Sequence, residues 1–506
     1  MRHRLITVFK SILAPFRALR LSSLLTAVLP LLFWLPAQAA VTINAMAPLL
    51  IGDPRAPDAA GSTPAWEDFR HQLRVLKSQG VGAISTDIWW GLIEANRPGE
   101  IEWSYYKKMS AVIRSEGLHW VPILSFHQLG GNVGDVGYMP LPSWVWTRFK
   151  NQPDIFKSES DLMFRSEYGN ISKEYVSFWA TSLVSDDYRR VMRSFRDNFA
   201  KDADIIDEIN VSLGPSGELR YPSYNAHDKN VDYPSRGALQ AYSAPAINDF
   251  RRAMNNKYKS LSALNLAWGF GLESWEQVFP PGPEYLKGSF WQNKEQFSNY
   301  GKDFFDWYNQ SLVSHGQKML RIADSVFAEP GSPFKNTDLG GKVPGVHWRT
   351  ASDRLAEVSA GLIRTSYNDW LSPAASYGYA DTLKVFSETK SKMKLVLHFT
   401  AVELDDGRDG PLAASLAKSL AGWIGDSASK LHIEIKGENA LAGELSNPRA
   451  WTNMLDAVSK HHYSGVTLLR SNEIVNNDYR EKQLAGFAAQ VKSFSGLRCY
   501  RVLRPQ

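Results

Sequence analysis

Hydrophobic positions follow two alternating patterns along most of the chain. Short runs that are apolar over nearly their whole length, and rich in β-branched and aromatic residues, are separated by stretches in which apolar residues recur every three or four positions. The first pattern predicts strands buried on both faces, as in a parallel sheet. Eight such runs are expected to form strands, at residues 41–49, 82–90, 119–127, 205–214, 342–348, 394–404, 430–441 and 465–471.

The second pattern predicts helices between the strands. The stretch 64–79 begins with Pro64, which suits the first position of a helix, and is followed by Gly80, which ends one. The stretch 186–200 opens with Ser-Asp-Asp at 185–187, residue types that cap a first turn. Eight strands alternating with helices in one chain predict an α/β fold, the (β/α)8 TIM barrel.

The connection between the fourth and fifth strands is much longer than one helix needs. Its central part, residues 225–300, is rich in Tyr, Trp, Pro and Asn. We expect a large, partly helical insertion that covers the face of the barrel where the strands end. The sequence shows no low-complexity linker and no repeat beyond the strand–helix alternation. The segment after the last predicted strand is about long enough for one helix. Residues 40–506 are therefore expected to be a single domain without an appended binding module.

The first 39 residues differ in composition from the rest. A basic start is followed by an apolar run and by Ala-Gln-Ala at 37–39. This order is typical of a secretory signal peptide, here cleaved after Ala39, and predicts a secreted or periplasmic protein. The alternative is a membrane anchor, but the apolar run is short for a span of about 20 residues and Pro30 interrupts it.

The charge balance does not indicate a charged partner. The formal net charge is +5, and the first 39 residues carry five basic residues and no acidic one, so the remainder is neutral. A neutral body gives no reason to expect a nucleic acid or an anionic membrane as partner. Cys499 is the single cysteine, which excludes an intramolecular disulfide and a metal site built from several cysteines.

Polar residues follow the predicted strands at the ends where a TIM barrel builds its active site. Aromatic residues lie near them in the sequence, among them Tyr224, Trp348 and the pair Trp89–Trp90, of which we expect one ring in the core and one in the cleft. Carboxylates and imidazoles bind sugar hydroxyls, and aromatic rings cover the apolar face of a pyranose, so the combination indicates a carbohydrate cleft. The polar residues are Asp87, His127, Glu218, His347, Thr400, Glu438 and Arg470.

Two of these residues, Glu218 and Glu438, could supply the carboxyl pair that hydrolysis of a glycosidic bond needs, one group protonated and one ionised. They end the fourth and seventh strands, on roughly opposite sides of the barrel mouth. This placement favours a wide separation with room for a water, and therefore inversion at the anomeric carbon. Structural alternatives stay open, since Glu218 could simply pair with Arg220 and Glu438 could cap the helix that follows it.

The other polar residues also have structural alternatives. Asp87 could cap a helix, His127 could be a core histidine, and Lys342 and Arg470 could be partners in structural ion pairs. The glycine-rich stretch 125–135 predicts a lid that carries Asp135 over a substrate. A phosphate-binding loop is disfavoured there, because the Lys-Ser/Thr pair is missing and the stretch follows the third strand.

Seven segments, taken in order, resemble motifs of the β-amylase family, glycoside hydrolase family 14. Together they span nearly the whole chain after residue 40. The second and third are long and highly specific, whereas the two shortest count only through their position. The segments are DIWWG (87–91), SFHQLGGNVGD (125–135), GPSGELRYPSY (214–224), KVPGVHW (342–348), FT (399–400), GENAL (437–441) and LLR (468–470).

The resemblance implies an enzyme that removes maltose from the non-reducing end of α-1,4-glucan, with inversion to the β anomer. Glu218 would be the general acid and Glu438 the general base that activates water. Asp87 and His127 would hold the glucose at the non-reducing end, and Asp135 would move with the lid. The remaining residues implied to contact glucan or line the site are Lys342, His347, Thr400 (on a moving inner loop), Asn439, Leu441 and Arg470.

The sequence departs from the family pattern at three positions. The family often has Cys where Leu129 stands, Asn where His398 stands and Trp where Arg349 stands. None of these positions is implied to take part in the chemistry. The changes therefore bear on chain-length preference more than on reaction type.

Two other functions stay open from the sequence. One is a retaining TIM-barrel glycosidase that acts on β-linked sugars, and the other is a glucan-binding protein that does not hydrolyse. The two-carboxylate mechanism needs no metal or cofactor, and the sequence has no dedicated ligand cluster, although a structural calcium ion stays open. We expect a cofactor-free monomer without an appended starch-binding module.

Overall fold

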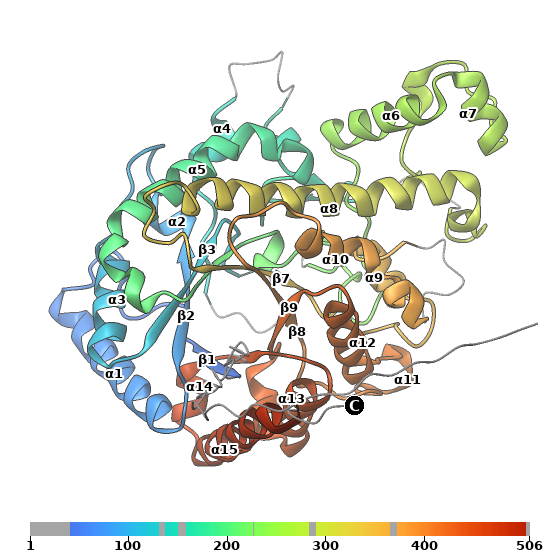
Figure 1. Ribbon diagram of the computed structural model, residues 1–506. Coiled ribbons are helices and arrows are strands. Elements are labelled where there is room, and N and C mark those ends of the chain that lie inside the picture. The colour runs from blue at the N-terminus through green and yellow to red at the C-terminus, as the bar shows by residue number, and fades with distance from the viewer. Residues whose placement is uncertain are drawn as a thin grey trace, which may run out of the picture. The chain divides into compact units, whose positions relative to one another are not determined.

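The computed structural model describes residues 41–130, 137–149, 158–225, 227–282, 290–364 and 372–501, the last seven of these by their backbone alone. Eight parallel strands close into a barrel in the order β1-β10-β9-β8-β7-β6-β3-β2 (Figure 1). All eight predicted strands are present, so the TIM barrel is confirmed. The barrel strands are β1 (Thr42–Met46), β2 (Ala83–Trp89), β3 (His119–Ser125), β6 (Glu208–Val211), β7 (Asp338–Val343), β8 (Leu395–Thr400), β9 (Glu434–Glu438) and β10 (Gly465–Leu468).

Helices surround the barrel, and a short antiparallel pair, β4 (Phe164–Arg165) and β5 (Ile171–Ser172), lies in the connection between β3 and β6. The described residues form one compact unit. The helices are α1 (Thr63–Ser78), α2 (Trp90–Ile93), α3 (Ser104–Ser115), α4 (Ser143–Thr147), α5 (Thr181–Asn198), α6 (Ala244–Tyr258), α7 (Leu261–Trp268), α8 (Asn299–Phe327), α9 (Leu355–Ser359), α10 (Ala380–Ser387), α11 (Gly410–Ala413), α12 (Ala417–Lys430), α13 (Pro448–Lys460), α14 (Ser471–Val475) and α15 (Asp478–Arg501).

Helix α1 confirms the predicted helix at 64–79, whereas α5 begins earlier than the sequence indicated. Ser185, expected to cap the helix, instead lies one turn inside it and donates a hydrogen bond to the Thr181 carbonyl at 2.8 Å. Asp187 is fully buried and forms ion pairs with Arg148 and Arg190. The Ser-Asp-Asp sequence therefore anchors the helix in the core and does not start it.

Strand β7 spans Asp338–Val343, so the prediction of 342–348 placed this strand too late. Its first half contains Gly340 and Gly341, which weaken the apolar signal of a strand. A Cβ at Gly340 would lie 2.0 Å from the Asn210 side-chain oxygen and 2.6 Å from a Glu208 carboxylate oxygen. Glycine is needed here because polar side chains of β6 cross the barrel interior over this point.

Those polar side chains form a buried charged cluster. Glu208 on β6 accepts a hydrogen bond from Lys436 on β9 at 2.6 Å and contacts His398 on β8. Burial raises the pKa of Glu208, but the charges of His398 and Lys436 outweigh that effect and hold it well below its usual range. Paired charges from β6, β8 and β9 thus meet in the barrel interior.

The insertion after the fourth barrel strand is large and partly helical, as predicted. Its helices α6 and α7 pack against α8: the rings of Phe250 and Trp307 lie 5.0 Å apart, and Trp268 donates to Asp303 at 2.8 Å. The insertion reaches the strand ends through the segment before α6. There Tyr233 lies against Trp348, with ring centroids 5.3 Å apart.

In the part of the chain that the structure describes, we find no helix with the length and apolar character needed to cross a membrane. Residues 1–40, which include the predicted signal peptide, lie outside the described ranges.

Candidate active site

A tight turn places Glu218 at the mouth of the barrel. After β6 the chain forms a single 3-10 turn, Pro215–Gly217, in which Gly217 has φ +80°. A Cβ at Gly217 would lie 3.2 Å from the imidazole of His127, so glycine allows the turn to pass this close to the ring. The backbone then pairs with β7, where Leu219 N–H donates to the Lys342 carbonyl at 2.8 Å.

The Glu218 carboxylate has two side-chain partners. Arg220 Nε donates to Oε2 at 2.9 Å, and Thr400 Oγ1 on β8 donates to Oε1 at 3.2 Å. The local ion pair with Arg220, considered above as a structural alternative, therefore exists. It does not remove Glu218 from the site, because Thr400 ends a barrel strand and approaches the same carboxylate.

Glu438 ends β9 and is held by a different cation. Lys342 Nζ donates to Glu438 Oε1 at 2.7 Å, with only 9% of the lysine and 7% of the glutamate side chain exposed. Lys342 thus contacts both predicted catalytic segments, through its backbone at Glu218 and through its ammonium at Glu438. In register, Thr400 on β8 lies opposite Glu438 on β9.

Asp87 and Arg470 lie together at another part of the strand ends. Asp87 Oδ1 accepts a hydrogen bond from Ser125 Oγ at 2.9 Å. Arg470 Nη1 lies 3.9 Å from Asp87 Oδ2. Two residues nearly 400 positions apart in the sequence are brought together because β1 closes the barrel between β2 and β10.

His127 lies near Asp87 and is buried in neutral form. Its Nδ1 pairs with Ser212 Oγ at 2.9 Å, and its ring centroid lies 5.2 Å from that of Trp89. Burial lowers the pKa of His127 to about 4, against the opposing charge of Asp87. Trp90 packs instead against Phe126 in the core, so the two rings have different neighbours, although both are buried.

The loop after β7 adds His347 and an aromatic wall. His347 Nδ1 pairs with Ser415 Oγ at 2.8 Å, and burial lowers its pKa to about 4. The rings of Tyr224 and Trp348 lie 4.8 Å apart, and Tyr233 lies 5.9 Å from His347. Of the aromatic residues singled out from the sequence, Tyr224 and Trp348 are therefore brought together, and Tyr233 joins them.

The chain after β9 carries the last two predicted site residues. Asn439 is fully buried, and its side-chain oxygen accepts from Leu469 N–H at 2.7 Å. Leu441 is partly buried and packs against Ala401 and Leu404 of the inner loop after β8. The two residues thus join the ends of β8, β9 and β10.

Sequence reasoning missed Glu403 on the inner loop. Its carboxylate accepts from the backbone N–H groups of Ala440 and Leu441 at 2.9 to 3.0 Å, directly after Glu438. Burial raises the pKa of Glu403 to about 7, although these backbone donors lower it. Its position three residues after Thr400 was the available signal, but the strand predicted at 394–404 included it, whereas β8 ends at Thr400.

The predicted lid is only partly described. Leu129 and Met139 pair through both backbone hydrogen bonds, at 2.9 and 3.1 Å, and so join the two ends of this loop. Asp135 lies outside the described residues. Within the described ranges, no group of three or more His, Cys, Asp or Glu side chains is arranged to hold a metal ion.

Comparison with known proteins agrees with this geometry. The family model for "Glycosyl hydrolase family 14" matches residues 58–496. The thermophilic β-amylase of Thermoanaerobacterium thermosulfurigenes is 37% identical over 417 residues, which cover 81% of this chain and 68% of that protein. The β-amylase of Cytobacillus firmus is 36% identical over 434 residues, covering 85% and 84% of the two chains.

Comparison with solved structures indicates the same family. The catalytic domain of the β-amylase from Paenibacillus polymyxa superposes with a TM-score of 0.72 at 33% identity, covering 90% of this chain and 98% of that one. A β-galactosidase from Bacillus circulans sp. alkalophilus reaches a TM-score of 0.54 at 12% identity over 90% of this chain and 56% of its own, a likeness of fold alone. The chain belongs to glycosyl hydrolase family 14.

Proposed function

We propose that the protein is a β-amylase, which hydrolyses α-1,4-glucan from the non-reducing end and releases β-maltose with inversion. The observation that carries the proposal is the pair of glutamates at the barrel mouth, each held by its own cation. Glu218 pairs with Arg220 at 2.9 Å and Glu438 with Lys342 at 2.7 Å. Family membership supports this reading over a retaining glycosidase or a glucan-binding protein without activity.

In this mechanism Glu218 donates its proton to the glycosidic oxygen while Glu438 takes a proton from water. The water attacks the anomeric carbon from the face opposite the departing sugar chain, so the configuration inverts. The ammonium of Lys342, 2.7 Å from Glu438, stabilises the negative charge that a base must carry before the reaction.

The remaining residues would bind the glucan. We assign the glucose at the non-reducing end to Asp87 and His127, with Arg470 beside Asp87 and Asp135 on the lid. His347, with the rings of Tyr233 and Trp348 beside it, would contact the chain further along. Thr400, Asn439 and Leu441 would line the site around the two glutamates, and Lys342 would touch glucan close to Glu438.

Residues 1–39 are proposed to be a secretory signal peptide, so that the enzyme acts outside the cytoplasm as a monomer without a cofactor. The apolar run and the Ala-Gln-Ala sequence support export. N-terminal sequencing of the exported protein should read from Ala40. A mature N-terminus at Met1 with membrane-bound protein would identify an anchor instead.

The test of the activity is the anomeric NMR spectrum of the first products formed from maltohexaose by the chain starting at Ala40. We expect β-maltose before any α anomer appears by mutarotation. E218Q and E438Q should each lose about 10²- to 10⁴-fold in kcat or more, the range for removing a general acid or base.

E444Q is the matched control, because Glu444 pairs with Arg408 away from the two cations named above. It should keep the wild-type rate. Early α-maltose would indicate a retaining enzyme, and glucan binding without product would indicate a binding protein; either result would reject the proposed activity.

A further inference from the structure

The guanidinium of Arg220 lies between the Glu218 carboxylate, which is 15% exposed, and an amide that contacts the buried carboxylate of Glu174. On one side its Nε donates to Glu218 at 2.9 Å. On the other its Nη1 donates to Asn225 Oδ1 at 3.0 Å, and Asn225 Nδ2 in turn donates to Glu174. The Tyr224 ring lies beneath the guanidinium, 4.3 Å from its carbon, and only 1% of the Arg220 side chain is exposed.

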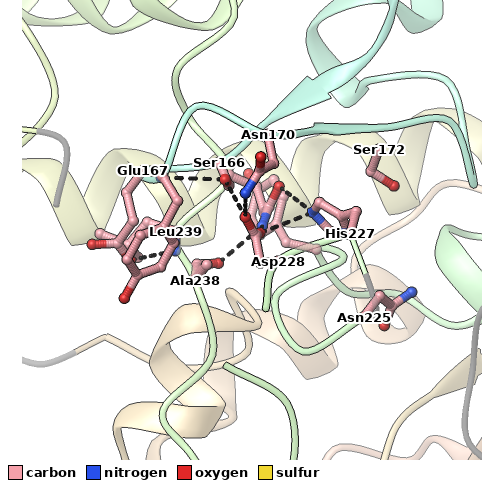
Figure 2. Close-up of polar contacts among 12 residues, drawn as sticks. Ser166, Glu167, Asn170, Ser172, Asn225, His227, Asp228, Ala238 and Leu239 are labelled. Carbon is pink, nitrogen blue, oxygen red and sulfur yellow. Dashed lines mark hydrogen bonds and ion pairs between the residues drawn. The ribbon is translucent and has the colours of Figure 1, made fainter. Parts of the chain in front are cut away.

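The position of Glu174 is fixed by residues that belong to a separate polar cluster (Figure 2). Ser172 and His227 approach its carboxylate, His227 at 3.8 Å. His227 is itself held by Asp228 at 3.1 Å, and Asp228 accepts from Ser166 at 2.6 Å. Glu174 is thus a buried carboxylate on a rigid support, connected through one amide to the cation that holds Glu218.

This arrangement addresses a conflict in the proposed mechanism. A guanidinium is permanently charged, and a carboxylate paired with it alone is held in the ionised form. Yet Glu218 must carry a proton in order to donate one to the glycosidic oxygen. One guanidinium facing two carboxylates is electrically neutral when the pair of carboxylates holds a single proton.

We propose that Glu174 is a positioning residue that shares the charge of Arg220 with Glu218, so that Arg220 orients the general acid without keeping it ionised. The inference rests on the proposed function and adds a role for a residue remote from the reacting atoms. Among the described contacts, Glu174 is connected to Glu218 through Asn225 and Arg220, and it takes no part in the bond-breaking step itself.

The other charged groups around this pair are consistent with one shared proton. Glu174 faces Arg220, His227 and Tyr224, and Glu218 faces Arg220, Tyr224 and the Thr400 hydroxyl. Burial raises the pKa of Glu174 to about 7, against the charges of Arg220 and His227. Two coupled carboxyls titrate as a unit, and removing one changes the titration of the other.

The experiment compares the pH dependence of kcat/KM for the wild type and E174Q, with maltohexaose as substrate. E174Q keeps the shape of the side chain but removes its negative charge. In this variant the charge of Arg220 is then shared with Glu218 and no longer with residue 174. The alkaline limb of the profile, where the acid loses its proton, should move to lower pH by about one unit or more. The product should still be β-maltose.

Two further variants separate charge from shape. E174D keeps the anion and should leave the alkaline limb in place while it lowers kcat by displacing Arg220. E167Q is the matched control, because Glu167 is an equally buried glutamate that pairs with Arg236 at 2.6 Å and accepts from Leu239 N–H at 2.8 Å. E167Q should lower the free energy of unfolding and leave the alkaline limb of the kcat/KM profile at the wild-type pH.

The results distinguish the inference from the proposed function. An active wild type with the same alkaline limb in E174Q would overturn the role of Glu174 and leave the β-amylase reading intact. A wild type that makes no maltose would overturn the proposed function first. If E174Q does not fold, N225A, which removes the connecting amide, should move the limb in the same direction; an unmoved limb there would reject the inference.

Discussion

At the scale of single residues, the site depends on two cations with different partners. Lys342 is a strand residue whose ammonium is buried against Glu438, and Arg220 is a turn residue whose guanidinium is buried against Glu218. A buried ion pair contributes little net stability, but removing one partner leaves an unpaired charge at high cost. The two cations therefore act mainly by fixing where each carboxylate lies and how it is charged.

K342M is expected to impair both activity and stability. It leaves Glu438 buried without its cation, at a cost of about 3–5 kcal/mol in the free energy of unfolding. Glu438 then stays protonated to higher pH, so the acid limb of the kcat/KM profile should move upward. The pH profile and urea denaturation measure the two effects.

K436M is the control for this change. Lys436 is another barrel lysine, buried against Glu208 at 2.6 Å. Its loss should lower stability by a similar amount but leave the acid limb where it is. Equal shifts of that limb in K342M and K436M would mean that Lys342 has no specific effect on Glu438.

The sequence indicated the candidate site residues but not their partners. Glu218 and Glu438 could be found because each follows an apolar strand and lies between glycines or in a recognisable motif. The partners Glu174 and Glu403 lie on connecting loops, where an acidic residue has no periodic signal. Their burial and their bonds to Asn225 and to the backbone at 440–441 exist only once the loops have folded together.

At the scale of elements, hydrophobic pattern located every barrel strand but not every boundary. Pattern reasoning works where a strand is continuously apolar, as at 119–125 and 395–400. It failed at the start of β7, where Gly340 faces side chains of β6 and Gly341 faces Leu213 and Phe386. It also failed at the start of α5, because Asp187 lies inside the helix, paired with Arg190 one turn later and with Arg148 from another segment.

G340A tests why this strand contains glycine. A methyl group at 340 would lie 2.0 Å from Asn210 Oδ1, so Asn210 and Glu208 must both move. We expect a loss of about 3 kcal/mol in the free energy of unfolding, the upper end for overpacking a tight interior. Urea denaturation measures it.

G443A provides the comparison for this substitution. A methyl group at Gly443 would meet no atom within 4 Å, so stability should change by less than about 0.5 kcal/mol. If G340A were as stable as G443A, the crossing side chains of β6 would not be what requires glycine in β7.

At the scale of the whole molecule, buried carboxylates make stability depend on pH from both sides. Glu208 is held ionised by His398 and Lys436, so the stability it contributes is lost as the pH falls through its depressed pKa. Burial raises the pKa values of Glu174 and Glu403 to about 7. Each residue therefore lowers the free energy of unfolding as the pH rises from the ordinary pKa of a glutamate towards 7. The protein should be most stable in mildly acidic solution.

E403Q isolates one of these contributions. In the unfolded chain a glutamate ionises near pH 4.3, whereas Glu403 ionises at about 7 when folded. Folding therefore favours its protonated form, and the stability associated with that proton is lost as the pH rises.

E403Q lacks this titration but also loses part of the bonding to the backbone of Ala440 and Leu441, which gives a constant offset. Between pH 5 and pH 8 the wild type should lose about 2–3 kcal/mol relative to E403Q, as measured by urea denaturation at several pH values. E273Q, at an exposed position, should follow the wild type throughout. A constant difference between wild type and E403Q across this range would show that Glu403 ionises at its ordinary pH despite its burial, and that its two backbone donors outweigh desolvation.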